Sequence, residues 1–192
     1  MTTELVRTLL AALGTRDGYT SEHSHGVANL ALAVGRRLDL SAADLLEVDQ
    51  VALLHDIGKI GIPDRILQKP GPLTHDEWNV MRTHPAIGAD LVSGMDAVAH
   101  LAPAIRAEHE RWDGTGYPDG LAREAIPTSS QIVFVCDALH AMTSDRPYRT
   151  AMSYRTALAR LQRNSGTQFA PAVVDATPPT IASIHPADFL RP

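Results

Sequence analysis

The chain has little of several features that mark common protein classes. It contains one cysteine, Cys136, in 192 residues, so no internal disulfide can form and a reducing, cytoplasmic setting is expected. Basic residues (17) are fewer than acidic ones (22), and the net charge of −5 argues against a DNA-binding surface. The longest apolar stretch, at residues 27–34, is too short to span a bilayer, and the N-terminal residues do not resemble a signal peptide. We therefore expect a cytoplasmic domain without a membrane or DNA surface.

The composition that remains is that of an ordinary globular protein, with helical patterning along most of the chain. Apolar residues make up 44% and recur at helical spacing over residues 5–13 and 27–38. Capping patterns at Ser41 and Thr74 predict two further helices, the first ending near His55 and Asp56. Helices are also predicted over 86–94, 97–110, 129–144 and 154–163. We predict one all-α domain over residues 1–192, with an irregular tail at 177–192.

One apolar segment and two long loops depart from the simple helical pattern. Residues 132–135 (Ile-Val-Phe-Val) are the one strand candidate, but their apolar stripe continues at helical spacing, so a buried helix is predicted. Residues 57–73 and 111–128 are rich in glycine and proline, and we expect both to be irregular. Long loops in a compact helical domain are more often functional than merely connecting.

Side chains that can bind metal recur along the chain at intervals of about one helix plus a loop. The intervals are 32, 29, 25 and 28 residues, and the positions are His23, His55 with Asp56, His84, His109 and Asp137. A helical bundle can bring such residues to a common depth in its core. Mixed imidazole and carboxylate ligands favour two divalent transition metals, Fe or Mn, over a structural zinc.

The chemistry expected of such a site is phosphodiester hydrolysis. Asp56 and a water would bridge the two metals, and the resulting hydroxide would attack phosphorus in line. Lys59 follows Asp56 by three residues and would stabilise charge on the phosphate oxygens.

Each of these residues also has a plainer interpretation. His55 and Asp56 could be a hydrogen-bonded pair at a helix end, and His84 could simply begin a helix before Pro85. Asp137 lies in an apolar helix, so it is either a costly buried charge or a ligand. His25 competes with His23, but the two lie about 200° apart around a helix, so only one can face the site.

The quoted residues resemble the HD-GYP branch of the HD phosphohydrolase superfamily. The resemblance spans about residues 15–176 and includes His55-Asp56-Ile57-Gly58-Lys59, the run from Trp112 to Leu121 and residues 143–149. It implies a compact helical bundle with a metal site in its core, and hydrolysis of cyclic di-GMP to pGpG or GMP. It also favours His23 over His25. The implied metal ligands are His23, His55, Asp56, His84, His109 and Asp137, and the implied dinucleotide contacts are Lys59, Tyr117, Arg146 and Arg149.

Three departures from the family pattern bear on the site. Glu108 stands where the family has the first of two adjacent histidines, and since a carboxylate binds hard cations we include it as a seventh candidate ligand, although it could be a surface acid. Tyr19 replaces the glutamate of members with three metals, so two metals are expected. His140 replaces an aspartate near the guanine edge and becomes the candidate base contact.

These departures keep other functions open. A non-catalytic module would bind a cyclic dinucleotide, or a diguanylate cyclase through the Gly116-Tyr117-Pro118 loop. A related hydrolase would act on another cyclic dinucleotide. Arg146 and Arg149 could form surface ion pairs instead of nucleotide contacts.

Overall fold

The computed structural model describes residues 2–14, 20–145 and 150–179. These residues form helices joined by turns and loops, with no strand inside those ranges and one isolated bridge between Ser165 and Phe169. In chain order, with η marking 3-10 helices, the elements are α1 (Thr2–Gly14), α2 (Thr20–Arg37), α3 (Ala42–Leu54), η1 (Ile57–Gly61), α4 (Asp64–Leu67), α5 (His75–Met81), α6 (His84–Ser93), η2 (Ala99–Leu101), α7 (Ala102–Arg106), η3 (Arg123–Ala125), α8 (Thr128–Thr143), α9 (Tyr154–Arg163) and α10 (Pro171–Ala176).

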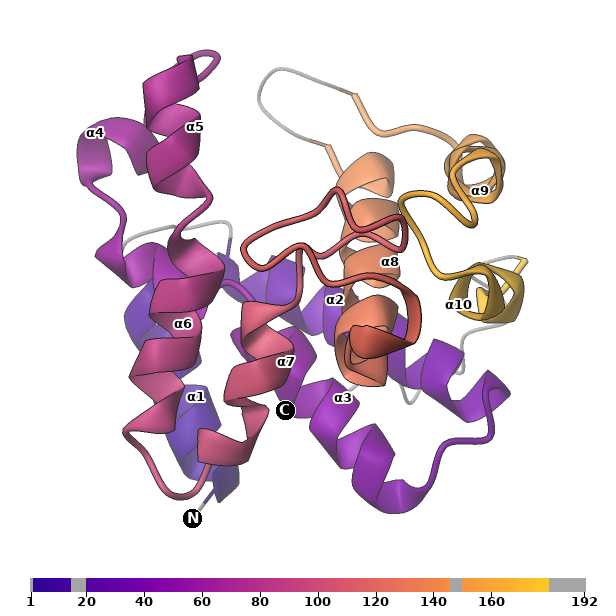
Figure 1. The fold of residues 1–192 in the computed structure, drawn as a ribbon, viewed down its shortest axis with the longest axis horizontal. Helices are drawn as coiled ribbons and strands as arrows, with labels where there is room; N and C mark the ends of the chain where they lie inside the picture. The colour runs from indigo at the N-terminus through magenta and orange to yellow at the C-terminus, as the bar shows by residue number, and fades with distance from the viewer. Residues whose placement is uncertain (1, 15–19, 146–149, 180–192) are drawn as a thin grey trace.

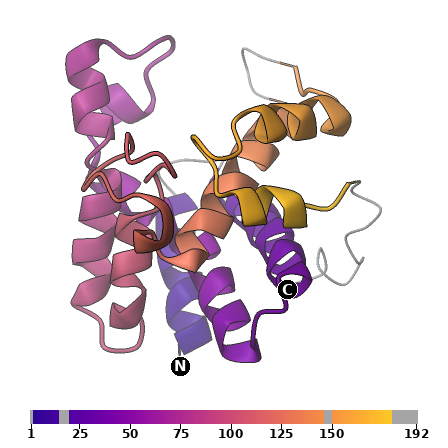
Figure 2. The same cartoon turned by 45° about the vertical axis from the view of Figure 1, so that its right-hand side comes forward.

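Helices α2, α3 and α8 pack against one another and form the centre of the bundle (Figure 1). Helix α1 packs on α2 and α3, while α6, α7 and η1 form a second layer beside them. Helices α9 and α10 cover α8 from the other side, as the turned view shows (Figure 2). Buried aliphatic side chains such as Val51, Leu54, Ile132 and Leu139 fill the space between the central helices.

The structure confirms the all-α fold and most of the predicted helices. Ser41 accepts a hydrogen bond from the backbone N–H of Asp44 at the start of α3, and Thr74 and Glu77 form a complete capping box at α5. Residues 132–135 lie within α8, which confirms the helix prediction. In the described ranges no helix is long and apolar enough to cross a membrane.

Three predictions about elements are wrong. Residues 97–110 do not form one helix, because the chain leaves α7 after Arg106 and turns. On a continuous helix Glu108 and His109 would point about 100° apart, whereas the turn lets both face the same place. Residues 57–73 contain η1 and α4, and residues 111–128 contain η3, so neither segment is wholly irregular; helix α10 was not predicted. Short helices such as these depend on tertiary packing more than on sequence pattern.

A close backbone contact between η1 and α6 sets the geometry on which the site depends. A Cβ atom on Gly58 would lie 1.8 Å from the carbonyl oxygen of His84 and 2.5 Å from the backbone nitrogen of Gly88. Only glycine permits this approach. It brings the segment that carries His55 and Asp56 directly beside the first turn of α6, where His84 lies.

Candidate metal centre

Seven side chains from five separate segments converge in the bundle core. Helix α2 supplies one, the α3–η1 junction two, the first residue of α6 one, the turn after α7 two, and α8 one. They form three overlapping groups. Within each group, the potential ligand atoms all lie within 4.8 Å of one another. The groups are His23, His55 and Asp137; His84, Glu108 and His109; and His55, Asp56 and Glu108. The structure therefore brings together all seven residues that the sequence nominated.

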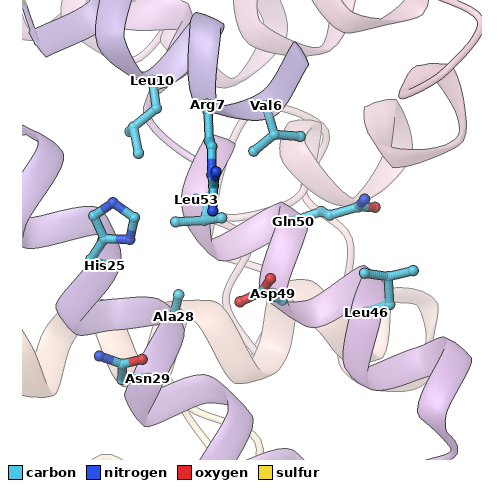
Figure 3. Close-up of a pocket in the computed structure, with 10 residues that line it drawn as sticks. All are labelled: Val6, Arg7, Leu10, His25, Ala28, Asn29, Leu46, Asp49, Gln50 and Leu53. Atoms are coloured by element: carbon cyan, nitrogen blue, oxygen red, sulfur yellow. The ribbon is translucent and has the colours of Figure 1, made fainter. Parts of the chain in front are cut away.

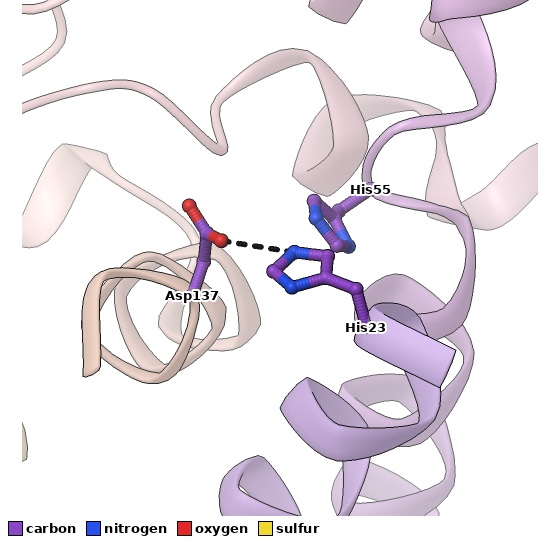
Figure 4. A group of neighbouring side chains, drawn as sticks. All are labelled: His23, His55 and Asp137. Carbon is purple, nitrogen blue, oxygen red and sulfur yellow. Dashed lines mark ion pairs between the residues drawn. The ribbon is translucent and has the colours of Figure 1, made fainter. Parts of the chain in front are cut away.

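The first group lies between α2, the end of α3, and α8. Nε2 of His23 is 3.1 Å from Oδ1 of Asp137, and the His23 and His55 rings meet edge to face with centroids 5.5 Å apart (Figure 4). His23 and His55 are buried, whereas Asp137 is partly exposed. This group offers two imidazole nitrogens and a carboxylate on one side of the centre.

The second group lies where α6 begins and α7 ends. Nε2 of His84 is 3.2 Å from Nε2 of His109, and Oε1 of Glu108 is 2.8 Å from the His109 nitrogen and 3.7 Å from that of His84. Three donors thus face one another, two of them buried and His109 partly exposed, in an arrangement that suits a divalent cation.

Asp56 lies between the two groups. Its Oδ2 is 3.4 Å from Nε2 of His55, and its Oδ1 is 3.6 Å from Nε2 of His84. Lys59 donates a 2.6 Å hydrogen bond to the same Oδ2. A carboxylate with one oxygen toward each group has the position of a bridging ligand.

Two of the histidines are oriented by backbone carbonyl groups. Nδ1 of His55 is 2.7 Å from the oxygen of Ala52, and Nδ1 of His84 is 2.8 Å from the oxygen of Met81. When Nδ1–H donates to a carbonyl, Nε2 is left to face the centre as a lone-pair donor. Metal-binding histidines are commonly held in this way.

The centre is a cluster of strongly coupled charges. Burial alone would lower the pKa of His55, but the carboxylates of Asp56 and Glu108 raise it to about 10. Burial alone would raise the pKa of Glu108, but the imidazoles of His109 and His55 lower it to about 2. The pKa of Asp137 is likewise lowered to about 2, against the effect of burial, by its hydrogen bond to His23. The raised pKa values of His55 and His109 mean that protons on these two imidazoles offset carboxylate charge that bound metals would otherwise offset.

Two features show that the donor set fits bound cations. Oε2 of Glu108 is buried and has no hydrogen-bond partner, although a buried carboxylate oxygen without one is costly. Nε2 of His84 and Nε2 of His109 face each other, and both can serve as lone-pair donors only if a cation lies between them. Divalent metals held by these residues would give the Glu108 oxygen a partner and would accept both imidazole lone pairs.

The loop that carries Tyr117 folds back over the centre. The Tyr117 ring stacks on His109 with centroids 4.9 Å apart, and the guanidinium of Arg82 lies 5.4 Å from the centre of the Tyr117 ring. Burial raises the pKa of Tyr117, so its phenol stays protonated and can donate a hydrogen bond. Gly116 is needed here, since a Cβ atom would lie 2.4 Å from the backbone nitrogen of Arg111.

Glu110 anchors this loop, a role that the sequence interpretation missed. The buried Oε1 of Glu110 accepts hydrogen bonds from the backbone N–H groups of Asp119 (2.6 Å) and Gly120 (2.9 Å). Asp119 also accepts two 2.7 Å hydrogen bonds from Arg106. In the sequence, the only indication of this role is that Glu110 follows Glu108 by two residues. The turn after α7 directs Glu110 toward the loop and Glu108 toward the metal centre.

The competition between the two histidines of α2 is resolved by position. His23 faces the centre, whereas His25 lines a cavity of about 330 Å³ between α1, α2 and α3, together with residues such as Val6 and Leu46 (Figure 3). The two histidines thus lie on opposite faces of one helix.

His140 lies beside the centre, one turn after Asp137. Its Nδ1 is 2.9 Å from Nδ1 of His23, and its ring packs where α2 has Gly26. A Cβ atom on Gly26 would lie 2.2 Å from Nε2 of His140. Contact between His140 and a base stays a prediction. Arg146, Arg149 and Tyr19 lie outside the described residues.

Comparison with known proteins identifies the family. A family model described as "HD domain" matches residues 6–173. The cyclic di-GMP phosphodiesterase response regulator RpfG of Xanthomonas campestris is 45% identical, a cyclic di-GMP phosphodiesterase of Thermotoga maritima 41% and the 3'3'-cGAMP-specific phosphodiesterase 3 of Vibrio cholerae 38%. These matches cover 90, 84 and 80% of this chain, but only 46, 44 and 33% of the relatives. The chain thus spans less than half the length of these relatives.

Solved structures share the fold. A cyclic GMP-AMP specific phosphodiesterase of V. cholerae superposes with a TM-score of 0.71 at 22% identity, covering 92% of this chain and 48% of the other. An HDG"Y"P protein from Bdellovibrio bacteriovorus has a TM-score of 0.67 at 18% identity, covering 92% and 60%. The matching family model and the relatives at 38 to 45% identity establish that the chain belongs to the HD domain family.

Proposed function

We propose that this chain is the catalytic domain of a metal-dependent phosphodiesterase that hydrolyses cyclic di-GMP to pGpG, to GMP, or to both. The observation that carries the proposal is the convergence of seven potential metal ligands on one buried centre, with Lys59 at its edge. The side chain of Lys59 keeps 24% of its surface exposed. It can therefore meet a phosphate that approaches from solvent while it contacts Asp56.

The proposed cofactors are two divalent transition metals, Fe or Mn. His23, His55 and Asp137 would hold one, His84, Glu108 and His109 the other, and Asp56 would be shared between them. Bound there, the metals would activate a water as nucleophile and offset negative charge on the phosphate. The four imidazoles and three carboxylates suit such metals better than Mg, which prefers oxygen ligands alone.

The protein's own groups would position the dinucleotide. The Lys59 ammonium would stabilise charge that develops on the non-bridging phosphate oxygens. The Tyr117 phenol, protonated and supported by His109, would donate a hydrogen bond to the substrate. Arg146 and Arg149 are proposed as further phosphate contacts and His140 as a base contact.

Cyclic di-GMP is favoured over other dinucleotides because the relatives at 45 and 41% identity are named for it. The relative at 38% is named for 3'3'-cGAMP. A cytoplasmic location accords with the single buried cysteine and is part of the proposal.

A product assay across several substrates tests this proposal. Protein loaded with Mn²⁺ or, without oxygen, with Fe²⁺ is incubated with cyclic di-GMP, 3'3'-cGAMP and cyclic di-AMP, and the products are separated by chromatography. We expect linear products, fastest from cyclic di-GMP, and none from the His55→Ala variant. Faster turnover of 3'3'-cGAMP would reassign the substrate.

A different result would support the alternative that the domain is a non-catalytic module. In that case, calorimetry would show that the metal-loaded protein binds cyclic di-GMP, but none of the three dinucleotides would be hydrolysed. That module would bind a dinucleotide, or a diguanylate cyclase through the Gly116-Tyr117-Pro118 loop, and His55→Ala would leave cyclase binding intact. The position of Glu108 favours catalysis instead. Glu108 is buried among the other potential metal ligands, so the glutamate that replaces the family's histidine still offers a metal donor.

A further inference from the structure

Glu108 differs from the other residues of the centre because it belongs to two ligand groups and has two potential donor atoms. It shares one group with His84 and His109 and another with His55 and Asp56. His55 is the other residue common to two groups, but an imidazole held through Nδ1 offers a single donor. A carboxylate can offer one oxygen to each of two cations.

The two oxygens of Glu108 have different surroundings. Oε1 is 2.8 Å from Nε2 of His109 and 3.7 Å from Nε2 of His84, so it faces the second group. Oε2 is buried and has no hydrogen-bond partner, and the Glu108 side chain is 2% exposed. Glu110 also has a buried Oε2 without a partner, but only Glu108 belongs to two ligand groups, so only its Oε2 has potential metal ligands around it.

We propose that Glu108 is a second bridging carboxylate. Oε1, which faces His84 and His109, would bind the metal that these two residues hold, and Oε2 would be available to the metal held by His55 and Asp56. A histidine in the same place would serve one metal only. This inference rests on the proposed metal centre and deepens it: with Asp56, the two metals share two carboxylates, and three carboxylates offset three of their four positive charges.

A second bridge has consequences for metal choice. An additional anionic oxygen donor favours harder cations such as Mn²⁺ and Fe²⁺ over softer ones, and it stabilises occupancy of both sites together. Binding of the first metal therefore fixes an oxygen donor for the second.

Electron paramagnetic resonance of protein loaded with two Mn²⁺ ions per chain tests the bridge directly, without substrate. Bridging carboxylates mediate exchange coupling between the ions, so the native chain is expected to give a coupled spectrum. Glu108→His keeps a donor for the second group but removes the bridge, and it is expected to retain two Mn²⁺ with weaker coupling. Unchanged coupling would overturn the proposal, and so would failure of the native chain to bind two Mn²⁺.

Calorimetry supplies a second measurement that does not depend on Glu108→His folding. His84→Ala removes a donor from one group, so the remaining Mn²⁺ occupies the other. In the double variant His84→Ala/Glu108→Gln, this Mn²⁺ ion is expected to bind at least about 10-fold more weakly than in His84→Ala alone, because a charged donor is lost. Glu110→Gln in the same background is the matched control, since Glu110 is equally buried, also has an Oε2 without a partner, and belongs to no ligand group.

Equal effects of Glu108→Gln and Glu110→Gln would mean that Glu108 acts only through its charge, and the bridge would be refuted. Neither measurement uses a dinucleotide. If the bridge fails while cyclic di-GMP is still hydrolysed, the proposed function stands. If the bridge holds without hydrolysis, the metal centre stands and the substrate assignment falls.

Discussion

Single residues in the centre carry charges whose balance depends on pH. The metal-free protein keeps His55 protonated, since Asp56 and Glu108 raise its pKa to about 10 against the effect of burial. A histidine in an unfolded chain has a pKa of about 6.5. The folded state therefore binds a proton that the unfolded state releases over the interval between these values.

The stability of the metal-free protein is expected to fall as pH rises. The contribution of His55 is fully present below about pH 6.5 and is lost as pH rises through about 10, because the folded-state pKa is the higher one. Urea unfolding in the presence of a chelator, at pH 7 and pH 9, measures this difference. His55→Gln should remove much of the slope. A metal-free stability that stays constant or increases between these pH values would contradict the account.

Lys59 supports a second prediction at this scale. Lys59→Met keeps the length of the side chain but removes the ammonium, and we expect kcat on cyclic di-GMP to fall about 100-fold, as for removal of one oxyanion donor. Bound metal, measured by elemental analysis, should stay near the native level. Lys69→Met is the control, because Lys69 pairs with Glu77 of α5 instead of a residue of the centre. If kcat falls equally in Lys59→Met and Lys69→Met, Lys59 has no specific role in catalysis.

Elements position these residues through close contacts, and among the described glycines Gly58, where η1 meets α6, has the least room for a side chain. Gly58→Ala would place a Cβ atom 1.8 Å from a backbone oxygen, so the two elements must separate. We expect a loss of about 3 kcal/mol or more in the free energy of unfolding, together with weaker metal binding, because His84 moves away from Asp56.

Gly61→Ala is the matched control in the same element. Its Cβ atom would lie 3.0 Å from the side chain of Ile87, which can shift, so a loss below about 1.5 kcal/mol is expected. Thermal or urea unfolding of both variants measures the loss in stability, and Mn²⁺ titration measures the loss in metal affinity. Similar behaviour of the two variants would show that the close backbone approach at Gly58 does not position the site.

Elements also show where sequence reasoning succeeds. The caps at Ser41 and Thr74 are local, so their helices could be predicted from neighbouring residues. The break after Arg106 and the short helix α10 depend on packing against distant segments, which no local pattern encodes. For the same reason Glu110 was missed: its partners are backbone N–H groups of a loop whose return path is set by tertiary structure.

At the scale of the whole molecule, the site is a product of the bundle and not of any one motif. The intervals between histidines indicated that several helices would contribute, and the HD-GYP resemblance selected His23 over His25. The sequence could nominate Glu108 as a ligand, but the buried, partnerless Oε2 is visible only after five segments have come together.

The central claim is that this assembled centre holds two metals and that both are needed to hydrolyse a cyclic dinucleotide. The most direct test titrates Mn²⁺ into metal-free protein and measures bound metal and cyclic di-GMP turnover in the same samples. We predict that two ions bind per chain and that turnover rises only as the second site fills. Turnover by metal-free protein, or none at full occupancy of both sites, would contradict the account.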